Sequence, residues 1–411
     1  MLTAAQRRVL SNARYRRLWI ATSISELGSN VGRMAFILLV HQLARESGED
    51  PEHDVALIVL LETIPMLLLG PVAGALVDRL DRRGLLVACD LLSVVLMLAI
   101  PWLALLSSRA PLFAVAAVFS AIGTVFHPAR QSALPDLVQP QDLPEANGIS
   151  TTTSSVNLIA GMALAGVLIE LLGKVGTFVL TSVGFGVSAF LMMGLVLPPR
   201  EDLARRVSDF LREALRGVAF LVSRPVLVYL TLVYFLTYGF VGAWITLLPS
   251  FTEEFLAVDP DRGAPLLIAT FGLGGVLGGV FGPRLGGRLG RGRVVLGALL
   301  SIGLGMTAFA LSPYLLLSLA LVVAGGALMF SVLVQDATIV HETVPPDFHG
   351  RVFAARYPMQ ALGYLVATSS ILLLASSYRP QELMLGASLV FAGAVVATTL
   401  LLPGARALYR L

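Results

Sequence analysis

Long apolar runs alternate with short polar segments over the whole chain. A helix needs about 20 apolar residues to cross a bilayer, and we count twelve runs of roughly that length. These runs predict twelve membrane-spanning helices, and therefore an all-α integral membrane protein. Their expected starts lie near Leu18, Val55, Leu85, Leu112, Leu143, Gly176, Val226, Leu266, Val294, Tyr314, Val352 and Leu383.

Two short motifs recur at about half the chain length, which indicates an internal repeat. The turn LVDRLDRRG after the second run is echoed by LGGRLGRGR after the eighth, and LVQPQDLPEANG before the fifth by TVPPDFHGRVF before the eleventh. We therefore expect two six-helix halves, residues 1–199 and 225–411, as in secondary transporters with a substrate site near the membrane midplane. Between them, residues 200–224 predict an amphipathic linker helix on the cytoplasmic leaflet.

Composition and charge support a membrane protein and orient it. Hydrophobic residues make up 56% of the sequence and charged residues 13%, about half the charged share of a soluble domain. If both termini lie on one side, 23 of the 29 lysines and arginines fall on that side. Because basic residues concentrate in cytoplasmic loops, we expect both termini in the cytoplasm, a multi-pass location in the cell inner membrane, and no nucleic-acid partner. The opposite loops hold Arg45, Arg109, Lys174, Arg262 and Arg379.

The turn after the second run resembles the signature of the major facilitator superfamily, Gly-x-Leu-x-Asp-Arg-x-Gly-Arg-Lys. It departs from that signature at Asp81, where the family usually has glycine, and at Arg83, where it has lysine. In the second half, Gly287 stands where the aspartate would be. The resemblance covers essentially the whole chain and implies the fold of that family. We expect the arginines of the turn to contact anionic lipid headgroups. The matching positions are Gly74, Leu76, Asp78, Arg79 and Arg82.

Three further segments are similar to the branch of that superfamily that contains enterobactin exporters and macrolide efflux proteins. They are Pro128–Arg130, Pro135–Val138 and Asp142–Asn147. Bacterial lysophospholipid transporters share part of this pattern, so the resemblance does not name the substrate. Drug antiporters often have a Gly-Pro pair in the fifth span, where this chain has Gly161 followed by Met162. That departure weakens the similarity to the best-known drug antiporters.

Several polar side chains interrupt the first two apolar runs, where each charge costs roughly 2.5–3.5 kcal/mol. Glu26, Asn30 and Arg33 are spaced by four and then three residues, which puts them on one face of a helix. Glu62 enters the second span from the other end and reaches about the depth of Arg33. We expect an Arg33–Glu62 ion pair, which leaves Glu26 without a basic partner and able to carry a proton. Alternatively, Glu26 pairs with Arg33 and only fixes the first span.

A second polar group lies near the predicted cytoplasmic ends of the spans. In facilitator-type transporters the signature aspartate holds the start of span 11 and a nearby arginine when the protein faces outward. Carried over to this chain, Asp78 would contact the helix start at Arg351 and the side chain of Arg130, and a carboxylate near a helix N-terminus is favourable on its own. The alternative is a static cluster of salt bridges. The residues assigned to this gate are Gly74, Asp78, Arg79, Arg82, Asp90, Arg130, Asp336, Arg351 and Arg356.

The seventh span carries aromatic residues that we assign to a substrate cavity. Tyr234 and Tyr238 are one turn apart, and Trp244 follows. Apolar walls with a few polar tips suit amphipathic ligands, although such aromatics more often pack helices together.

Enzyme chemistry finds little support in the sequence. His341 and Glu342 begin a zinc-protease pattern, but Pro345 replaces its second histidine. We also find no glycine-rich nucleotide loop with the lysine and hydroxyl it requires. We therefore expect no enzyme, metal or cofactor, but a monomeric secondary transporter in contact with membrane lipids. It would export an amphipathic molecule of the drug or siderophore class by alternating access in exchange for protons. The alternative is a lysophospholipid transporter or flippase that protons do not drive.

Overall fold

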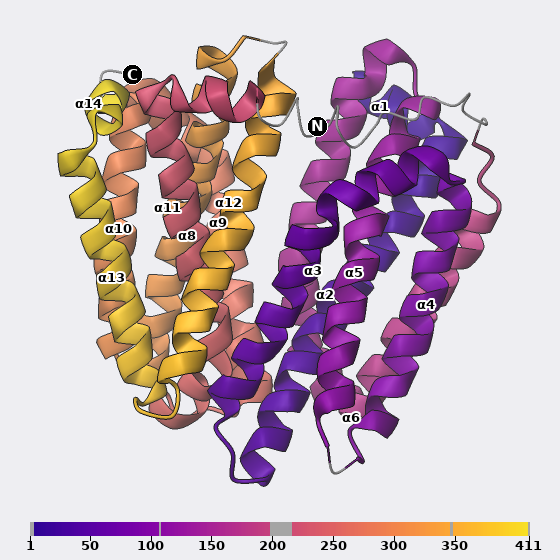
Figure 1. Cartoon of the computed structure of the whole chain (residues 1–411), viewed down its shortest axis with the longest axis horizontal. Coiled ribbons are helices and arrows are strands. Elements are labelled where there is room, and N and C mark those ends of the chain that lie inside the picture. The colour runs from indigo at the N-terminus through magenta and orange to yellow at the C-terminus, as the bar shows by residue number, and fades with distance from the viewer. Residues whose placement is uncertain (1–3, 107, 198–215, 346–347, 410–411) are drawn as a thin grey trace. The chain divides into compact units, whose positions relative to one another are not determined.

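The computed structural model of the chain describes residues 4–106, 108–197, 216–345 and 348–409, which form helices and short connections without a β-strand (Figure 1). The surroundings of Gly74 and the side chains of Asp78, Arg79 and Arg351 lie outside the described part. The helices are α1 (Ala4–Ser11), α2 (Ala13–Glu46), α3 (Pro51–Arg79), α4 (Arg82–Leu103), α5 (Ala110–Ala133), α6 (Leu143–Met193), α8 (Pro225–Ser250), α9 (Pro260–Leu289), α10 (Arg291–Leu311), α11 (Leu315–Thr343), α12 (His349–Leu374), α13 (Pro380–Leu401) and α14 (Pro403–Tyr409).

The prediction of twelve membrane-spanning helices is confirmed. In the described ranges, nine helical segments are long and apolar enough to cross a membrane. One of these, α6, consists of two helices joined at Gly173, where the backbone has φ 69° and ψ 171°. The remaining two spans are α2, with 34 residues, and α12, with 26. At a rise of 1.5 Å per residue both exceed the roughly 30 Å of a bilayer core.

Contacts of α2 show that the chain reverses direction at Gly173. The hydroxyl of Tyr15, near the start of α2, donates to the carbonyl of Ala146 at the start of α6. Arg17, two residues further along α2, donates to the carbonyl of Leu191 near the other end of α6. A straight helix would separate Ala146 and Leu191 by roughly 68 Å. The positive φ that reverses the chain is one that glycine adopts without strain.

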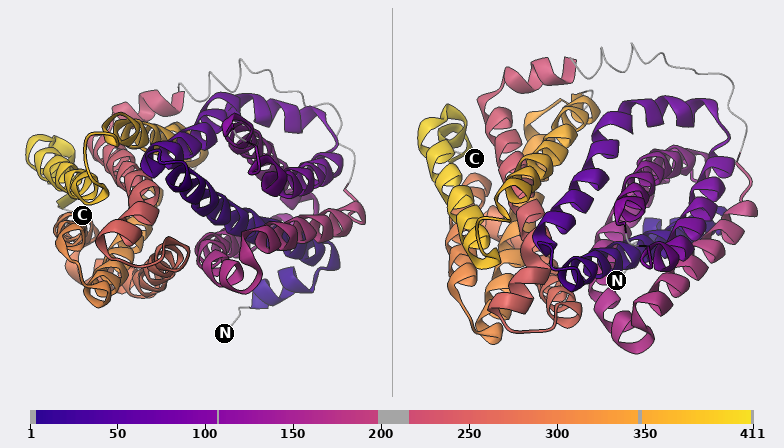
Figure 2. Two further views of the ribbon diagram at one scale, coloured as in Figure 1. Left: turned by 90° about the horizontal axis from the view of Figure 1, so that it is seen from below. Right: turned by 60° about the horizontal axis from the view of Figure 1, so that its bottom comes forward.

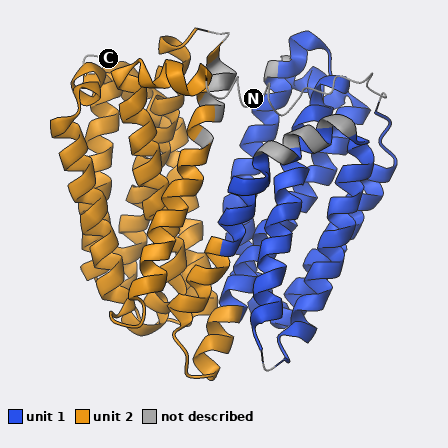
Figure 3. Cartoon of the chain, viewed as in Figure 1, with its two compact units in different colours: residues 1–39, 61–207 blue, residues 40–60, 208–411 orange. Residues whose placement is uncertain are grey.

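The chain divides into two compact units (Figure 3). Unit 1 comprises residues 1–39 and 61–207, and unit 2 comprises residues 40–60 and 208–411. In unit 1, α4 packs against α5 and α6; in unit 2, α9 packs against α11, α8 against α12, and α10 against α11 and α13 (Figure 2). The close approach of α9 to α11 depends on Gly274 and Gly278, because a Cβ at either would meet α11 backbone. Most of the linker predicted at 200–224 lies outside the described residues.

The two related turns between α3 and α4 and between α9 and α10 close in different ways. Asp81 stands where the family signature has glycine, and its side chain accepts hydrogen bonds from the backbone N–H groups of Arg83 and Gly84, at 3.2 and 2.9 Å. Such a cap satisfies donors that a helix start leaves unpaired, and Asp81 keeps a negative φ of −62°. In the second half Gly290 has φ 90°. The aspartate therefore replaces backbone freedom with a side-chain cap.

Ion pairs tie together the end of unit 1 at which α2 begins. Arg82 is buried, where it pairs with Asp136 of the 3₁₀ turn Leu134–Asp136 and donates to the carbonyl of Ser132 at 2.8 Å. The expectation that Arg82 contacts lipid headgroups is therefore wrong: its acidic partner holds it inside the protein. Arg8 of α1 bonds Asp142, and this hydrogen bond raises the pKa of Arg8 above its usual value. Both aspartates belong to the motifs that suggested the efflux branch.

Candidate functional site

The polar face predicted on the first span belongs to α2 and lies mostly within unit 1. Glu26 is buried, whereas Asn30 and Arg33 are partly buried. The Asn30 side chain donates to the backbone carbonyl of Glu26 at 2.7 Å. Next to it, α6 comes so close to α2 that a Cβ on Gly161 would lie 2.6 Å from the Asn30 Cβ and 2.9 Å from the carbonyl oxygen of Leu27. Gly161 therefore brings the polar residues of α6 within reach of α2.

Glu26 is not isolated, contrary to the prediction from the sequence. Arg130 of α5 forms an ion pair with it, with both side chains largely shielded from solvent at 14% and 8% exposure. The sequence predicts Arg130 at the cytoplasmic gate, because depth along α2 alone separates it from Glu26. A long arginine side chain from a neighbouring helix bridges the depth difference. Arg33, the partner in the alternative, forms an ion pair with Glu62.

Two residues of α6 that were not predicted from the sequence complete this site. The Ser154 hydroxyl lies 2.9 Å from Arg130 Nη1 and 2.9 Å from Glu26 Oε2, so it contacts both charged groups. The Asn157 side chain lies 3.4 Å from the same carboxylate oxygen and also donates to the carbonyl of Ser23. The available signal was the run STTTSSVN, an unusually polar stretch inside an apolar span. We call Glu26, Arg130, Ser154 and Asn157 the Glu26 cluster.

The predicted Arg33–Glu62 ion pair is confirmed. Arg33 Nε lies 2.7 Å from Glu62 Oε2, and the side chains are 25% and 12% exposed. The two residues come from opposite ends of consecutive spans, so their similar depth could be worked out from the helical rise alone. Their part in substrate or proton binding stays a prediction.

The described side chains assigned to the cytoplasmic gate have partners within their own units. Asp90 of α4 is buried and accepts a hydrogen bond from Ser25 of α2 at 2.7 Å. In unit 2, Arg356 of α12 bonds Asp336 of α11 at 2.7 Å. Arg130 belongs to the Glu26 cluster. The side chain of Asp78, the predicted latch, lies outside the described residues.

The aromatic residues of α8 pack within unit 2. The rings of Tyr234 and Tyr238 lie 4.6 Å apart, and the guanidinium of Arg356 lies 5.2 Å from the centre of the Tyr234 ring. The Tyr234 hydroxyl donates to Gln360 at 3.3 Å. Trp244 is buried against Phe271, with ring centres 5.5 Å apart. The geometry shows these residues in helix packing, and their assignment to a substrate cavity stays a prediction.

A polar cluster joins residues 40–60 to α8 within unit 2. It was not predicted from the sequence. Buried His41 lies 3.0 Å from the hydroxyl of Ser250 and 3.7 Å from Glu253, which belongs to the π-helical turn Phe251–Phe255. Arg45 pairs with Glu253 at 2.9 Å and with Glu254 at 3.7 Å. Arg45 was counted among the outer-loop cations, and its partners come from the acidic segment TEEF some 200 residues later.

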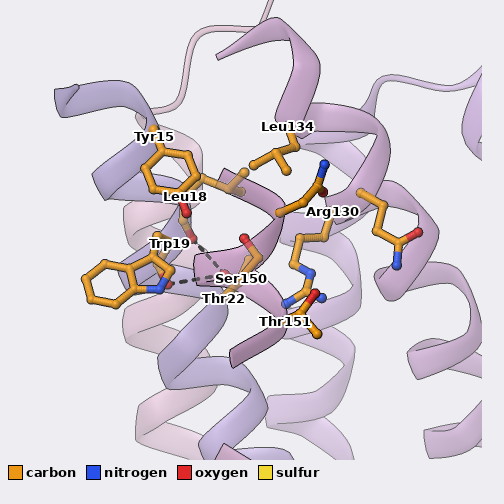
Figure 4. Close-up of a pocket in the computed structure, with 10 residues that line it drawn as sticks. Tyr15, Leu18, Trp19, Thr22, Arg130, Leu134, Ser150 and Thr151 are labelled. Atoms are coloured by element: carbon orange, nitrogen blue, oxygen red, sulfur yellow. Dashed lines mark hydrogen bonds between the residues drawn. The ribbon is translucent and has the colours of Figure 1, made fainter. Parts of the chain in front are cut away.

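A small pocket in unit 1, which we call the Arg130 pocket, adjoins the Glu26 cluster. Its volume is about 40 Å³. Figure 4 shows Tyr15 and Trp19 on one side, Leu134 above and Arg130 opposite, beside Thr151. The polar lining can hydrogen-bond water, ions or protonated groups. The lining residues are Tyr15, Leu18, Trp19, Thr22, Arg130, Gln131, Leu134, Asn147, Ser150 and Thr151.

In the described ranges, no group of three His, Cys, Asp or Glu side chains gathers in a way that could hold a metal ion. Glu342 of the incomplete protease pattern pairs instead with Arg291.

Comparison with known proteins relates this chain to efflux transporters. A family model described as Major Facilitator Superfamily matches residues 18–368. The multidrug efflux pump Tap of Mycolicibacterium fortuitum is 27% identical over 336 residues, which cover 78% of this chain and 79% of that protein. Macrolide efflux protein A of Streptococcus pyogenes is 24% identical over 356 residues, which cover 82% of this chain and 83% of that protein. Both names fall in the branch that the sequence motifs resemble.

Two further similarities are narrower in what they show. The chain spans 60% of the length of YkuC, an uncharacterized MFS-type transporter of Bacillus subtilis, with 25% identity over 263 residues. A solved structure of a bacterial homologue of the human lysosomal transporter Spinster, inward-facing and unoccupied, has a TM-score of 0.70 with 97% of both chains covered. At 16% identity, that likeness shows the fold alone.

Proposed function

Because this chain belongs to the major facilitator superfamily, we propose that it exports an amphipathic small molecule in exchange for protons by alternating access. Family membership makes it a multi-pass membrane transporter, and relatives named for multidrug and macrolide efflux support a small-molecule substrate of the drug or siderophore class. The family match and the transporter relatives support transport without chemical turnover.

The observation that carries the proposal is the ion pair of Glu26 and Arg130 inside unit 1. A proton on Glu26 removes the negative charge that balances Arg130 and leaves one net positive charge in a poorly solvated region. A cationic substrate would add a positive charge to the same region. Because uncompensated charge is costly there, proton and substrate should disfavour each other, which is the requirement for exchange.

Ser154 makes such a change of protonation possible without loss of structure. Its hydroxyl contacts both Arg130 and Glu26, and a hydroxyl can donate or accept. When Glu26 is charged, Ser154 donates to it; when Glu26 carries a proton, Ser154 can accept that proton's hydrogen bond. The cluster therefore has a satisfied arrangement in each state.

The other polar residues take supporting parts in this proposal. Asn30, Arg33 and Glu62 contribute a second polar layer beside the Glu26 cluster, in which the Arg33–Glu62 pair is fixed. Asp78 serves as the cytoplasmic latch, as the family signature implies, and Asp336 with Arg356 stabilises the corresponding region of unit 2.

A fluorescent reporter fused after Leu411 is expected to lie in the cytoplasm. The number of spans is even, and Arg406 and Arg410 follow the last span, so the excess of basic residues places both termini on the cytoplasmic side. A reporter that fluoresces only in the cytoplasm, with an external protease as a second readout, measures this. A reporter found outside would contradict the predicted orientation.

A thermal-shift screen tests the proposed substrate class. We expect a macrolide or a catecholate siderophore to raise the melting temperature of the purified protein, since a ligand at 100 times its Kd stabilises by about 2.7 kcal/mol. A lysophospholipid serves as the third probe. Stabilisation by the lysophospholipid alone would overturn the drug or siderophore class and favour the lipid transporter, and stabilisation by none of the three would contradict the proposed substrate class.

A further inference from the structure

The Arg130 pocket has the size and lining of a short water-filled passage. Each enclosed water needs roughly 10–15 Å³ of such a volume, so about 40 Å³ holds about three molecules. On its inner side lie the buried side chains of Tyr15 and Thr22. On its outer side lie Gln131, Asn147 and Thr151, which are exposed. The pocket thus connects the surface of unit 1 to its interior.

The inner end of the pocket lies one helical turn from the Glu26 cluster on both α2 and α6. On α2, Thr22 lines the pocket and Glu26 follows four residues later. On α6, Ser150 lines the pocket and Ser154, which contacts Glu26, follows four residues later. Residues four apart lie on the same helix face, about 5.4 Å along the axis. Arg130 completes the connection because it lines the pocket and pairs with Glu26.

We propose that the Arg130 pocket is the route by which the proton leaves Glu26 toward the side of the membrane on which α2 begins. The inference rests on the proposed proton coupling and adds a path to it. In the release step the O–H bond of protonated Glu26 breaks and the Ser154 hydroxyl accepts the proton as it gives up its own on the other side. That second proton passes to a water that enters from the pocket, whose lining on α6 includes Ser150, one turn from Ser154. The products are a hydronium ion in the pocket and the Glu26 carboxylate, which re-forms the ion pair with Arg130.

The charge of Arg130 makes this a release route. Arg130 lines the pocket and pairs with the Glu26 carboxylate, and its positive charge repels a hydronium ion toward the open end of the pocket. The other titratable groups near this path are His127 of α5, which interacts electrostatically with Glu26 and Arg130, and Tyr15 of α2, which interacts with Arg130. Neither lies between Ser154 and Glu26, whose side chains are in direct contact.

Filling the pocket tests the route functionally. Ser150→Leu places an apolar side chain among the pocket waters, and Ser155→Leu is the matched control, since Ser155 is exposed on the same helix and does not line the pocket. Loss of a positioned proton acceptor slows transfer by about a hundredfold or more. We therefore expect Ser150→Leu to slow proton-driven export by roughly a hundredfold or more, while substrate–substrate exchange, which needs no proton release, continues as in Ser155→Leu.

Silver ions test whether water reaches the inner end of the pocket. In a Cys89→Ser background, Thr22→Cys places a thiol in the pocket, and Ser93→Cys places one at a matched position of α4. Thr22 and Ser93 are both 3% exposed, and each hydroxyl bonds the carbonyl four residues earlier. We expect Ag⁺ added on the side where α2 begins to protect Thr22→Cys, but not Ser93→Cys, from later labelling after denaturation.

The outcomes separate the route from the proposed function. If wild-type transport ignores a pH gradient, the proton coupling fails and the route fails with it. If wild-type transport is proton-driven, but Ser150→Leu matches Ser155→Leu and Ag⁺ reacts with Thr22→Cys no faster than with Ser93→Cys, the route alone is overturned. If Ser150→Leu loses exchange as well, the Ag⁺ experiment alone tests the route: protection of Thr22→Cys but not Ser93→Cys supports it, and equal labelling of both overturns it.

Discussion

Glu26→Gln is expected to abolish uphill export while substrate binding stays measurable and loses its pH dependence. Glutamine has nearly the volume of protonated glutamic acid and still offers an oxygen to Arg130 and Ser154, so the Glu26 cluster keeps its hydrogen bonds. It cannot gain or lose the proton. A pH difference of one unit is worth about 1.4 kcal/mol per proton, a tenfold concentration ratio. Wild-type protein should approach that ratio, and Glu26→Gln should show no accumulation.

The measurement is accumulation of substrate in proteoliposomes with an imposed pH difference, together with binding at several pH values. Glu49→Gln, in the exposed connection between α2 and α3, is the matched control and should behave as wild type. Accumulation by Glu26→Gln against a gradient would show that Glu26 is not the coupling residue. It would favour the alternative function, a lysophospholipid transporter that protons do not drive.

Arg356→Met is expected to lower the free energy of unfolding by roughly 3–5 kcal/mol, the usual cost of breaking a buried ion pair from one side. The side chains of Arg356 and Asp336 are only 3% and 8% exposed. Arg356 also donates to the carbonyl of Leu230 at 3.1 Å. Without the arginine, the buried carboxylate of Asp336 loses the cation with which it is paired.

Denaturant titration of the detergent-purified protein measures this loss. The double variant Asp336→Asn, Arg356→Met removes the stranded charge and should recover most of the stability, because the penalty comes from the unpaired partner. Equal stability of wild type and Arg356→Met would contradict the account of this pair.

The spans could be predicted from the sequence because the ability of a segment to cross the bilayer depends mainly on its own residues. The expected start of each apolar run lies within a few residues of the start of an observed helix or, for the run at Gly176, of the reversal at Gly173. The Arg33–Glu62 pair could also be predicted, since depth along two consecutive helices follows from the helical rise. Local geometry was sufficient in each case.

Partners that depend on the packing of distant segments could not be predicted in this way. Arg130 reaches Glu26 across 104 residues of sequence, and Arg82 turns inward to Asp136 across 54. Which face an arginine takes at the end of a span depends on the neighbouring helix and not on its own segment. The contact of His41 with Glu253 could not be predicted for the same reason, because more than half the length of the chain separates the two residues.

Uphill transport by the wild-type protein tests the central claim most directly. Purified protein is reconstituted into liposomes with a pH difference, and the ligand identified by thermal shift is added at equal concentration on both sides. Proton-coupled exchange predicts that the ligand accumulates in the acidic compartment, up to about tenfold for one proton and one pH unit, and that a protonophore abolishes the accumulation. Equal distribution of the ligand, or movement that is the same with and without the pH difference, would contradict the account.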